Sequence, residues 1–377
     1  MFDFDRVVDR QGTASTKWEK YRGRDVLPMW VADMDFESPP AVIEALHRRV
    51  DHQVFGYTNT PELLIETVVA RLAERYDWQI DPNWLIWLPG LVAGINLACR
   101  SVGESGDQVA TFTPVYRPFL TAPGFSDRQL LTVPFDQSGG NWQIDFDRLA
   151  AAITPRTRLL LLCSPHNPIG RVFRRDELWA LAEFCQRHDL VICSDEIHCE
   201  LVLDNALGHI VTAALDGDIA RRTITLMAPS KTFNLAGLGC AFAIVPDDRL
   251  RARCKAVAAG IMAHVNLFGY SAALAAYRNG DDWHRALLDY LRGNRDRVQQ
   301  AVAAMPGLSM TPVEATYLAW IDTREAGLAD PAGFFESAGV GLSDGREFDG
   351  DGFVRLNFGC PRPVLDQALA RMQAALG

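Results

Sequence analysis

The chain has 377 residues and a formal net charge of −10. This length exceeds the size at which a single hydrophobic core stops growing, so two domains are expected. The acidic balance argues against nucleic acid or an anionic membrane surface as the main partner, and no apolar run approaches the length of a membrane-spanning helix.

The eight cysteines are scattered along the chain, and no two of them have the C-x-x-C spacing of zinc or redox sites. They are typical of small core residues in a reducing compartment. The first ten residues carry too many charges for a signal peptide. We therefore expect a cytoplasmic protein without a metal site.

Apolar runs separated by glycine and proline predict alternating strands and helices. Residues 1–24 are polar and lack periodicity, which indicates an N-terminal arm. Helices are expected from Pro40 and from Thr60, where proline lies in or beside the first turn. Strands are predicted over residues 84–88, 108–113, 129–135, 159–164, 190–194, 223–227 and 240–245. Apolar strands with helices between them indicate an α/β fold with a mostly parallel sheet, covered by helices on both faces.

The pattern changes in the C-terminal part of the chain. Residues 268–305 are helical and amphipathic, with a break near Asn279 and Gly280, and short strands are predicted over 317–321 and 353–357. A helix closes the chain. We place a large domain at residues 41–275 and expect residues 1–40 and 276–377 to form an N-terminal arm plus a smaller α+β domain.

Lys231 follows almost directly after the predicted strand 223–227. Moving an ammonium group out of water is costly unless the group is paired or loses its proton. A desolvated lysine becomes a neutral amine, which can form a Schiff base with a carbonyl compound. A loop lysine that points at solvent is the simpler alternative, and the residues that accompany Lys231 argue against it.

Three other predicted strands end in side chains with useful chemistry, namely Tyr116, Asn167 and Asp195. The carboxyl ends of parallel strands meet at one edge of a sheet, where ligands bind in α/β folds, so we expect these side chains to converge with Lys231. Gly90 lies in a turn that opens a helix, and the free N–H groups there suit a phosphate. The glycine motifs of dinucleotide-binding and P-loop proteins do not occur.

These groups together meet the chemical requirements of pyridoxal 5'-phosphate. The lysine forms the Schiff base, and the carboxylate keeps the pyridine nitrogen protonated so that the ring accepts carbanion electrons. The aromatic side chain stacks on the ring, the amide supports the ring hydroxyl, and helix-start N–H groups bind the phosphate. The sequence therefore predicts pyridoxal phosphate as the cofactor.

Motifs along nearly the whole chain also resemble a known family. Three of them, in this order and spacing, are similar to fold-type I pyridoxal-phosphate enzymes of the class I/II aminotransferase superfamily: SPHNPIGRVF, CSDEIH and APSKTFN. Five segments resemble, within that superfamily, the cystathionine β-lyases of the MalY/PatB type: MWVADMDF, VFGYTN, DEIHCEL, SKTFN and FVRLNFGCPR. The resemblance implies an amino-acid substrate and a homodimer with shared active sites.

The resemblance also implies roles for residues at the cofactor ring. It makes Lys231 the Schiff-base lysine and proton shuttle, and Asp195 the partner of the pyridinium nitrogen. Asn167 would support the ring hydroxyl, and Tyr116 would stack on the ring. His198 occupies a position where many aminotransferases carry a ring-hydroxyl tyrosine, which leaves either a direct or a supporting role open.

Further residues are implied at the phosphate and at the substrate. The phosphate would be held by the backbone of Gly90, Leu91 and Val92, the hydroxyl of Ser230, and Tyr57 of the neighbouring subunit. The substrate would be bound by Ala32, Tyr57 and Arg355, the last of which would grip its α-carboxylate through a bidentate fork.

Two positions depart from the pattern of the superfamily. Many members have serine three residues before the lysine and arginine eight residues after it, where this chain has Ala228 and Gly239. Phosphate binding is therefore expected to depend more on the loop at Gly90, on Ser230 and on Tyr57.

The resemblance implies α,β-elimination from L-cystathionine or related cysteine S-conjugates, which yields a thiol, pyruvate and ammonia. An amino-acid aminotransferase is the alternative, because it shares the early steps. A regulatory protein that keeps the cofactor and acts through a protein partner is a third possibility. The intact Lys231, Asp195 and Arg355 argue against the loss of catalysis.

Overall fold

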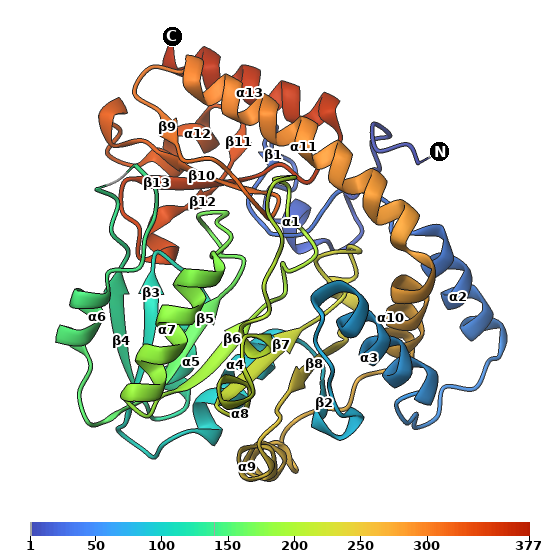
Figure 1. The fold of residues 1–377 in the computed structure, drawn as a ribbon. Coiled ribbons are helices and arrows are strands. Elements are labelled where there is room, and N and C mark those ends of the chain that lie inside the picture. Colours follow the sequence, from blue (N-terminus) through green and yellow to red (C-terminus); the bar gives the residue numbers. More distant parts are fainter. Residues whose placement is uncertain (1, 139) are drawn as a thin grey trace.

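The computed structural model describes residues 2–138 and 140–377. Its centre is a seven-stranded sheet, shown in Figure 1. In spatial order its strands are β2 (Leu85–Leu88), β8 (Ala241–Ile244), β7 (Thr223–Met227), β6 (Val191–Asp195), β5 (Thr157–Cys163), β3 (Gln108–Thr113) and β4 (Gln129–Pro134). Strands β3 to β7 pair in parallel, whereas β8 is antiparallel to both of its neighbours. The predicted α/β fold with a mostly parallel sheet is confirmed.

Helices cover both faces of this sheet because its strands are apolar on both sides. In β5, Leu159 and Leu161 pack in one core cluster, while Leu160 and Leu162 pack in another on the opposite face. The first face is covered by α4 (Leu91–Ser101), α5 (Arg117–Phe125) and α9 (Asp248–Ala258). The second face is covered by α6 (Phe146–Ala152), α7 (Arg175–Arg187) and α8 (Gly217–Arg221).

Most strand boundaries lie within two residues of the predicted ones. The predicted strand at 84–88 begins one residue later, because Pro82–Trp84 form a 3-10 turn that the side chain of Asp81 caps. Four more 3-10 turns occur in the described residues, at Thr212–Ala214, Ala236–Leu238, Arg324–Ala326 and Gly345–Phe348.

Three helices pack beside the sheet near β2 and β8 (Figure 1), namely α2 (Pro40–Asp51), α3 (Glu62–Tyr76) and α10 (Leu267–Asn279). The long helix α11 (Asp281–Ala304) continues from α10 towards the C-terminal elements. Gly280 separates α10 from α11, where a Cβ atom would lie 2.5 Å from the carbonyl oxygen of Ala276 and 2.7 Å from the ring of Phe233. Close packing therefore leaves no room for a side chain at this position, where the break between the helices was predicted.

The C-terminal part forms a second layer. An antiparallel sheet contains, in order, β12 (Ser343–Asp344), β13 (Phe353–Asn357), β10 (Leu318–Asp322) and β9 (Ser309–Met310). It packs with α11 and α12 (Pro331–Ser337), and α13 (Arg362–Leu376) packs against α11. The N-terminal arm lies against this layer (Figure 1). It contains α1 (Thr16–Glu19) and β1 (Leu27–Pro28), and β1 pairs in parallel with β11 (Val340–Gly341). The exact division of the chain into domains stays a prediction.

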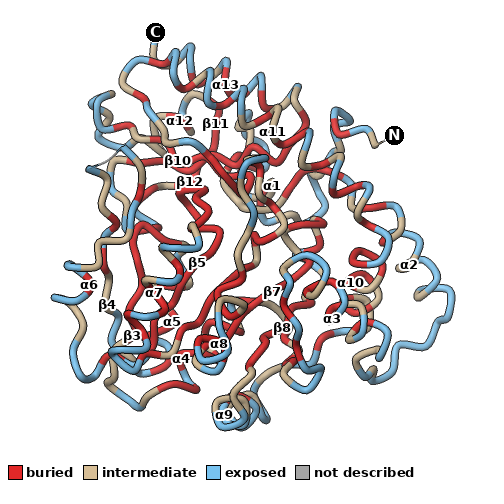
Figure 2. Tube along the Cα trace, in the orientation of Figure 1, coloured by how far each residue is buried: buried red, intermediate tan, exposed pale blue. Residues whose placement is uncertain are grey.

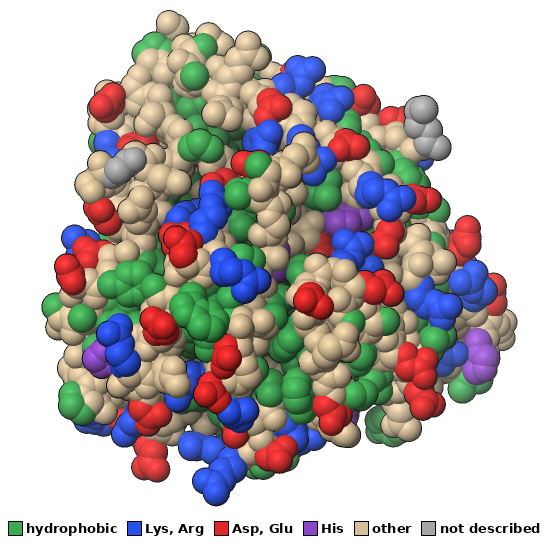
Figure 3. Space-filling view, viewed as in Figure 1, with side chains coloured by type: hydrophobic (Ala, Val, Ile, Leu, Met, Phe, Trp, Pro, Cys, Tyr) green, Lys and Arg blue, Asp and Glu red, His purple; other side chains and the backbone are tan. Residues whose placement is uncertain are grey.

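The buried residues concentrate in the strands and in the segments between the large sheet and the C-terminal layer (Figure 2). Acidic and basic side chains are interspersed over the face seen in Figure 3. Among the described residues, no helix is both long enough and apolar enough to cross a membrane.

Candidate active site

The ends of four strands and the loops that follow them bring the predicted residues to one edge of the large sheet. Tyr116 follows β3 and directly precedes α5, Asn167 follows β5, Asp195 ends β6, and Lys231 follows β7. The backbone N–H of Tyr116 donates to the carbonyl of Asn167 at 3.2 Å, so the first two loops are directly joined.

Lys231 lies beneath residues of the N-terminal arm. Its Nζ donates to the carbonyl oxygen of Ala32 at 2.5 Å. Burial and the charge of Arg355 lower the pKa of Lys231 to about 8, while the carboxylates of Asp33 and Asp195 oppose this shift. Near pH 8, a substantial share of Lys231 is therefore the neutral amine that Schiff-base chemistry requires.

Asp195 is buried, and its Oδ1 accepts from the backbone N–H of Ile197 at 3.1 Å. Burial raises the pKa of Asp195 to about 7; the Ile197 N–H and Lys231 lower it, and Glu196 adds to the rise. A cation placed against this carboxylate would favour its ionised form, so the site suits a protonated ring nitrogen.

Arg355 on β13 is held from several directions. Its Nη1 donates to Oδ1 of Asn167 at 3.0 Å, and its Nη2 donates to the carbonyl of Trp30 at 2.7 Å and to Oγ of Ser343 at 3.2 Å. Its guanidinium also lies 4.5 Å from the ring centre of Phe348. Burial lowers the pKa of Arg355 to about 10, so it stays charged at neutral pH. Its Nε is buried without a hydrogen-bond partner in the described part of the chain.

His198 and Tyr317 line the same region. Burial holds the pKa of His198 well below its usual value, so the imidazole is neutral at pH 7. Its Nδ1 has no hydrogen-bond partner among residues 2–138 and 140–377. Tyr317 lies edge-on to His198, with 6.3 Å between the ring centres, and its hydroxyl donates to the carbonyl of Ala32 at 2.9 Å.

The expected phosphate cradle lies where β2 meets α4. Gly90 precedes the first turn of α4, and a Cβ atom on Gly90 would meet no heavy atom within 4 Å. The N–H groups of a first helical turn have no partner within the helix. Leu91 is buried, Val92 is exposed and Ser230 is partly buried.

The departure at position 239 has a structural reason. Gly239 has φ of +58°, and a Cβ atom there would lie 3.0 Å from the carbonyl oxygen of Pro89, next to the cradle. A residue with a side chain at this position would therefore have a strained backbone and would be crowded by Pro89. The position itself adjoins the loop that is expected to bind the phosphate.

Tyr57 is fully exposed in a loop together with Val54 and Phe55, whose side chains are also exposed. The structure of the single chain therefore does not bring Tyr57 into the site.

Several residues of the site were not singled out from the sequence. They are Trp30, Asp33, Tyr317, Ser343 and Asn357. The motif FVRLNFGCPR contains Asn357, and the largely apolar segment MWVADMDF contains Trp30 and Asp33. Nothing in that pattern indicates that its carbonyl groups face Lys231 and Arg355.

The sequence profile of the family "Aminotransferase class I and II" matches residues 24–372. The chain is 37% identical to the cystathionine beta-lyase PatB of Bacillus subtilis, over 99% of this chain and 100% of PatB. It superposes on the crystal structure of OvoB with a TM-score of 0.97 and 49% identity, over 100% of this chain and 99% of OvoB. It superposes on cystalysin from Treponema denticola, which contains pyridoxal 5'-phosphate, with a TM-score of 0.95 and 33% identity, over 100% and 99% of the two chains.

The chain belongs to the class I and II aminotransferase family. The predicted resemblance is thus confirmed, and the cystathionine β-lyases of the PatB type are its relatives within the family. The cofactor of this pyridoxal-phosphate-dependent enzyme is confirmed as well. The residues present fit that group. Lys231 has a lowered pKa, and a cation would be needed to keep the buried Asp195 ionised. Nδ1 of His198 has no hydrogen-bond partner among the described residues, and no heavy atom lies within 4 Å of a Cβ position on Gly90.

Proposed function

We propose that this enzyme cleaves the Cβ–S bond of L-cystathionine or a related cysteine S-conjugate by α,β-elimination. With L-cystathionine and water, the products are homocysteine, pyruvate and ammonia. The supporting observation is the proximity of the Lys231 amine, the Asp195 carboxylate and the Arg355 guanidinium at one edge of the sheet. The similarity to PatB over the full chain supports the choice of a lyase.

Pyridoxal phosphate supplies an aldehyde that bonds an amino group and a ring that accepts electrons from the adjacent carbon. The residues of this chain do the rest. We assign Lys231 to bond the cofactor and, once freed, to take the proton from Cα of the substrate. Asp195 would hold a proton on the ring nitrogen. Tyr116 would stack on the ring, and Asn167 and His198 would lie beside its hydroxyl.

The phosphate is assigned to the first N–H groups of α4, from Gly90, Leu91 and Val92, and to the hydroxyl of Ser230. The substrate carboxylate is assigned to Arg355, whose Nε is the guanidinium nitrogen without a partner in the described chain. The backbone at Ala32 lies between Arg355 and Lys231 and would border the substrate at Cα.

The decisive experiment measures pyruvate release from L-cystathionine without any added keto acid. The parent protein is expected to release pyruvate, and Lys231→Ala is expected to release none. Near-normal release by Lys231→Ala would refute the assignment. If amino groups are exchanged only when a keto acid is added, the enzyme is an aminotransferase, the alternative that the family profile keeps open.

We also propose that the enzyme is a homodimer in which Tyr57 reaches the phosphate of the neighbouring subunit. Exposed apolar side chains support this proposal. They lie in α2, the following loop and the first turns of α3 and α4: Ile43, Val50, Val54, Phe55, Tyr57, Leu63 and Val92. Exposed apolar side chains are typical of interaction surfaces, and Val92 belongs to the first turn of α4, the helix assigned to the phosphate.

Subunit complementation tests this arrangement. Lys231→Ala and Tyr57→Ala subunits are each expected to form impaired dimers. If the sites are shared, a mixed dimer has one site without either substitution, so random mixing restores about a quarter of the parent activity. If Tyr57 serves its own chain instead, mixing restores nothing beyond the sum of the two variants.

A further inference from the structure

Residues 30–36 form an irregular segment, here called the strap, between the Lys231 loop and β13. The strap contains neither helix nor strand. Backbone carbonyls that lack such structure must find partners elsewhere when they are buried. In the strap, these partners are side chains from distant parts of the chain, among them Lys231, Tyr317 and Asn357.

Two of the strap carbonyls contact the groups assigned to catalysis and substrate binding. The carbonyl of Ala32 accepts from Nζ of Lys231 at 2.5 Å, and the carbonyl of Trp30 accepts from Nη2 of Arg355 at 2.7 Å. Any movement of the strap therefore moves the acceptors of both Lys231 and Arg355.

Asn357 and Asn234 hold the strap from either side. Nδ2 of Asn357 donates to the carbonyls of Val31 and Asp33, the latter at 2.7 Å. Asn234 lies three residues after Lys231, and its Nδ2 donates to the carbonyls of Met34 and Phe36 at 2.9 Å and 2.8 Å.

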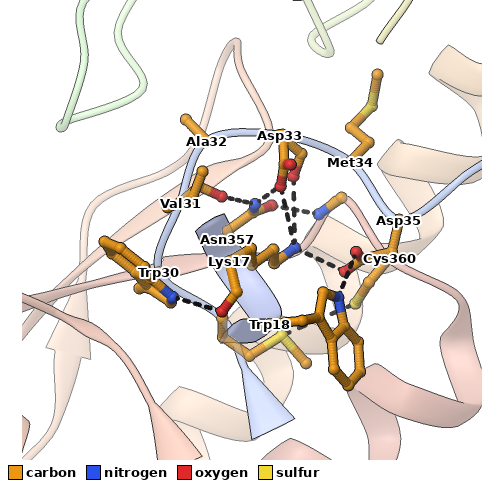
Figure 4. A network of polar contacts seen from close by, with 12 residues as sticks. Lys17, Trp18, Trp30, Val31, Ala32, Asp33, Met34, Asp35, Asn357 and Cys360 are labelled. Atoms are coloured by element: carbon orange, nitrogen blue, oxygen red, sulfur yellow. Dashed lines mark hydrogen bonds and ion pairs between the residues drawn. The ribbon is translucent and has the colours of Figure 1, made fainter. Parts of the chain in front are cut away.

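A buried ion pair anchors the strap from below (Figure 4). Lys17 of α1 is fully buried, and its Nζ lies 2.6 Å from Oδ2 of Asp35 and 3.7 Å from Oδ1 of Asp33. Arg10 pairs with the same two carboxylates, at 2.6 Å from Asp35 and 2.8 Å from Asp33. Burying a lysine completely is costly, so the contacts that compensate for this cost must be well formed.

We propose that the strap positions the Lys231 amine: whenever this amine is not bonded to the cofactor, the carbonyl of Ala32 holds it, and Asn357 and Lys17 fix the place of that carbonyl. The inference rests on the proposed role of Lys231 in taking the Cα proton. An amine that is held in place transfers protons faster than one that is free to turn away. Asn357 and Lys17 are thus positioning residues, and neither is assigned a contact with substrate or cofactor.

The chain offers a matched pair of substitutions. Asn357 and Asn294 are both fully buried, and each donates from Nδ2 to two backbone carbonyls. The carbonyls bound by Asn294 belong to Phe358 and Cys360, outside the strap. Both Asn357→Leu and Asn294→Leu remove two hydrogen bonds donated to carbonyls without changing the charge, and Asn357→Leu also removes the bond that its Oδ1 accepts from the N–H of Gly359. Only Asn357→Leu removes hydrogen bonds to the strap.

The first measurement is the rate of acetylation of Lys231 in the full chain after removal of the cofactor, at pH 7, by mass spectrometry of peptides. The chain has only four lysines, and the exposed Lys20 and Lys255 serve as internal references. Asn357→Leu loosens the strap and so weakens the hydrogen bond from the Lys231 ammonium to the carbonyl of Ala32. The freed amine is then more reactive, and the rate of acetylation of Lys231 relative to the reference lysines is expected to rise by about tenfold. Asn294→Leu is expected to leave this rate unchanged within about twofold.

The second measurement is the loss of the Cα proton of L-alanine to heavy water, expressed per cofactor-loaded site. Alanine has no leaving group, so the exchange reports proton transfer alone. Asn357→Leu and Lys17→Met are expected to slow the exchange by about tenfold or more. Asn294→Leu and Lys255→Met, the matched controls, are expected to exchange at the parent rate.

Equal acetylation and exchange rates in the strap variants and their controls would overturn the proposal. If Asn357→Leu does not fold, the same two measurements on Lys17→Met test the proposal. Acetylation requires no substrate, so its outcome is independent of the lyase activity. If Lys231→Ala still releases pyruvate, the proposed function fails; if it does not, and the strap variants behave like their controls, only the positioning role fails.

Discussion

Arg355 and Asn167 are joined by a hydrogen bond of 3.0 Å from Nη1 to Oδ1. The residue assigned to the substrate carboxylate is thus in direct contact with the residue assigned to the cofactor ring. The two side chains come from different layers, since Arg355 lies on β13 and Asn167 follows β5. A substrate carboxylate would therefore meet an arginine whose orientation is already fixed by the large sheet.

This contact predicts the effect of replacing Arg355 by lysine. Lysine keeps the charge but lacks the planar fork whose separate nitrogens reach Asn167, the Trp30 carbonyl and a carboxylate in different directions. We expect Arg355→Lys to raise the KM for the substrate by about tenfold to a hundredfold, as for the loss of a charge-assisted hydrogen bond. Arg174→Lys, in an ion pair with Glu314, is the control and should leave the KM unchanged. An unaltered KM in Arg355→Lys would contradict the assignment.

The pKa of Lys231 can be measured in the cofactor-free protein. Burial lowers it to about 8, so the rate of acetylation of Lys231 should rise with a midpoint near pH 8. The exposed Lys20 and Lys255 serve as references in the same measurement. Because the carboxylate of Asp33 raises the pKa of Lys231, Asp33→Asn should move the midpoint lower still. A midpoint shared by all the reactive lysines would show that Lys231 is not desolvated.

Asp195 should make the stability of the cofactor-free protein depend on pH. Its pKa is raised to about 7 in the folded chain, against about 3.9 in an unfolded one. The folded state thus keeps a proton that the unfolded state has lost, so this contribution to stability is complete below about pH 4 and is lost as the pH rises through about 7.

Asp195→Asn removes this dependence, because the amide is neutral at every pH. We expect the free energy of unfolding of the variant, relative to the parent, to increase by about 2 kcal/mol between pH 5 and pH 8. Urea unfolding of the two cofactor-free proteins at a series of pH values measures the difference. Parallel stability curves would mean that Asp195 ionises normally.

The anchor of the strap predicts a large cost for removing Lys17. Lys17→Met leaves the buried Asp35 without one of its two cationic partners, so the free energy of unfolding should fall by about 3 kcal/mol. Lys255→Met makes the same chemical change at an exposed helical position and should alter stability by less than about 0.5 kcal/mol. Similar urea midpoints for the two variants would show that the Lys17–Asp35 pair contributes little.

The sequence by itself determined the large sheet and the residues at the ends of its strands. Runs such as 223–227 and 108–113 are short, apolar and bounded by breakers, and these local properties set both the strand and the point where it ends. The position of Lys231 after one such strand, and of Asp195 at the end of another, then follows from parallel topology.

Only the tertiary structure decided how the strap contacts Lys231 and Arg355. The strap has no periodicity, and most of its carbonyl groups accept from side chains instead of from a ladder or a helical turn. Its donors come from far along the chain, since Asn357 is 326 residues from Val31 and Lys231 is 199 residues from Ala32. Local sequence patterns carry no information about such pairings, because they exist only after the N-terminal arm has packed between the two sheets.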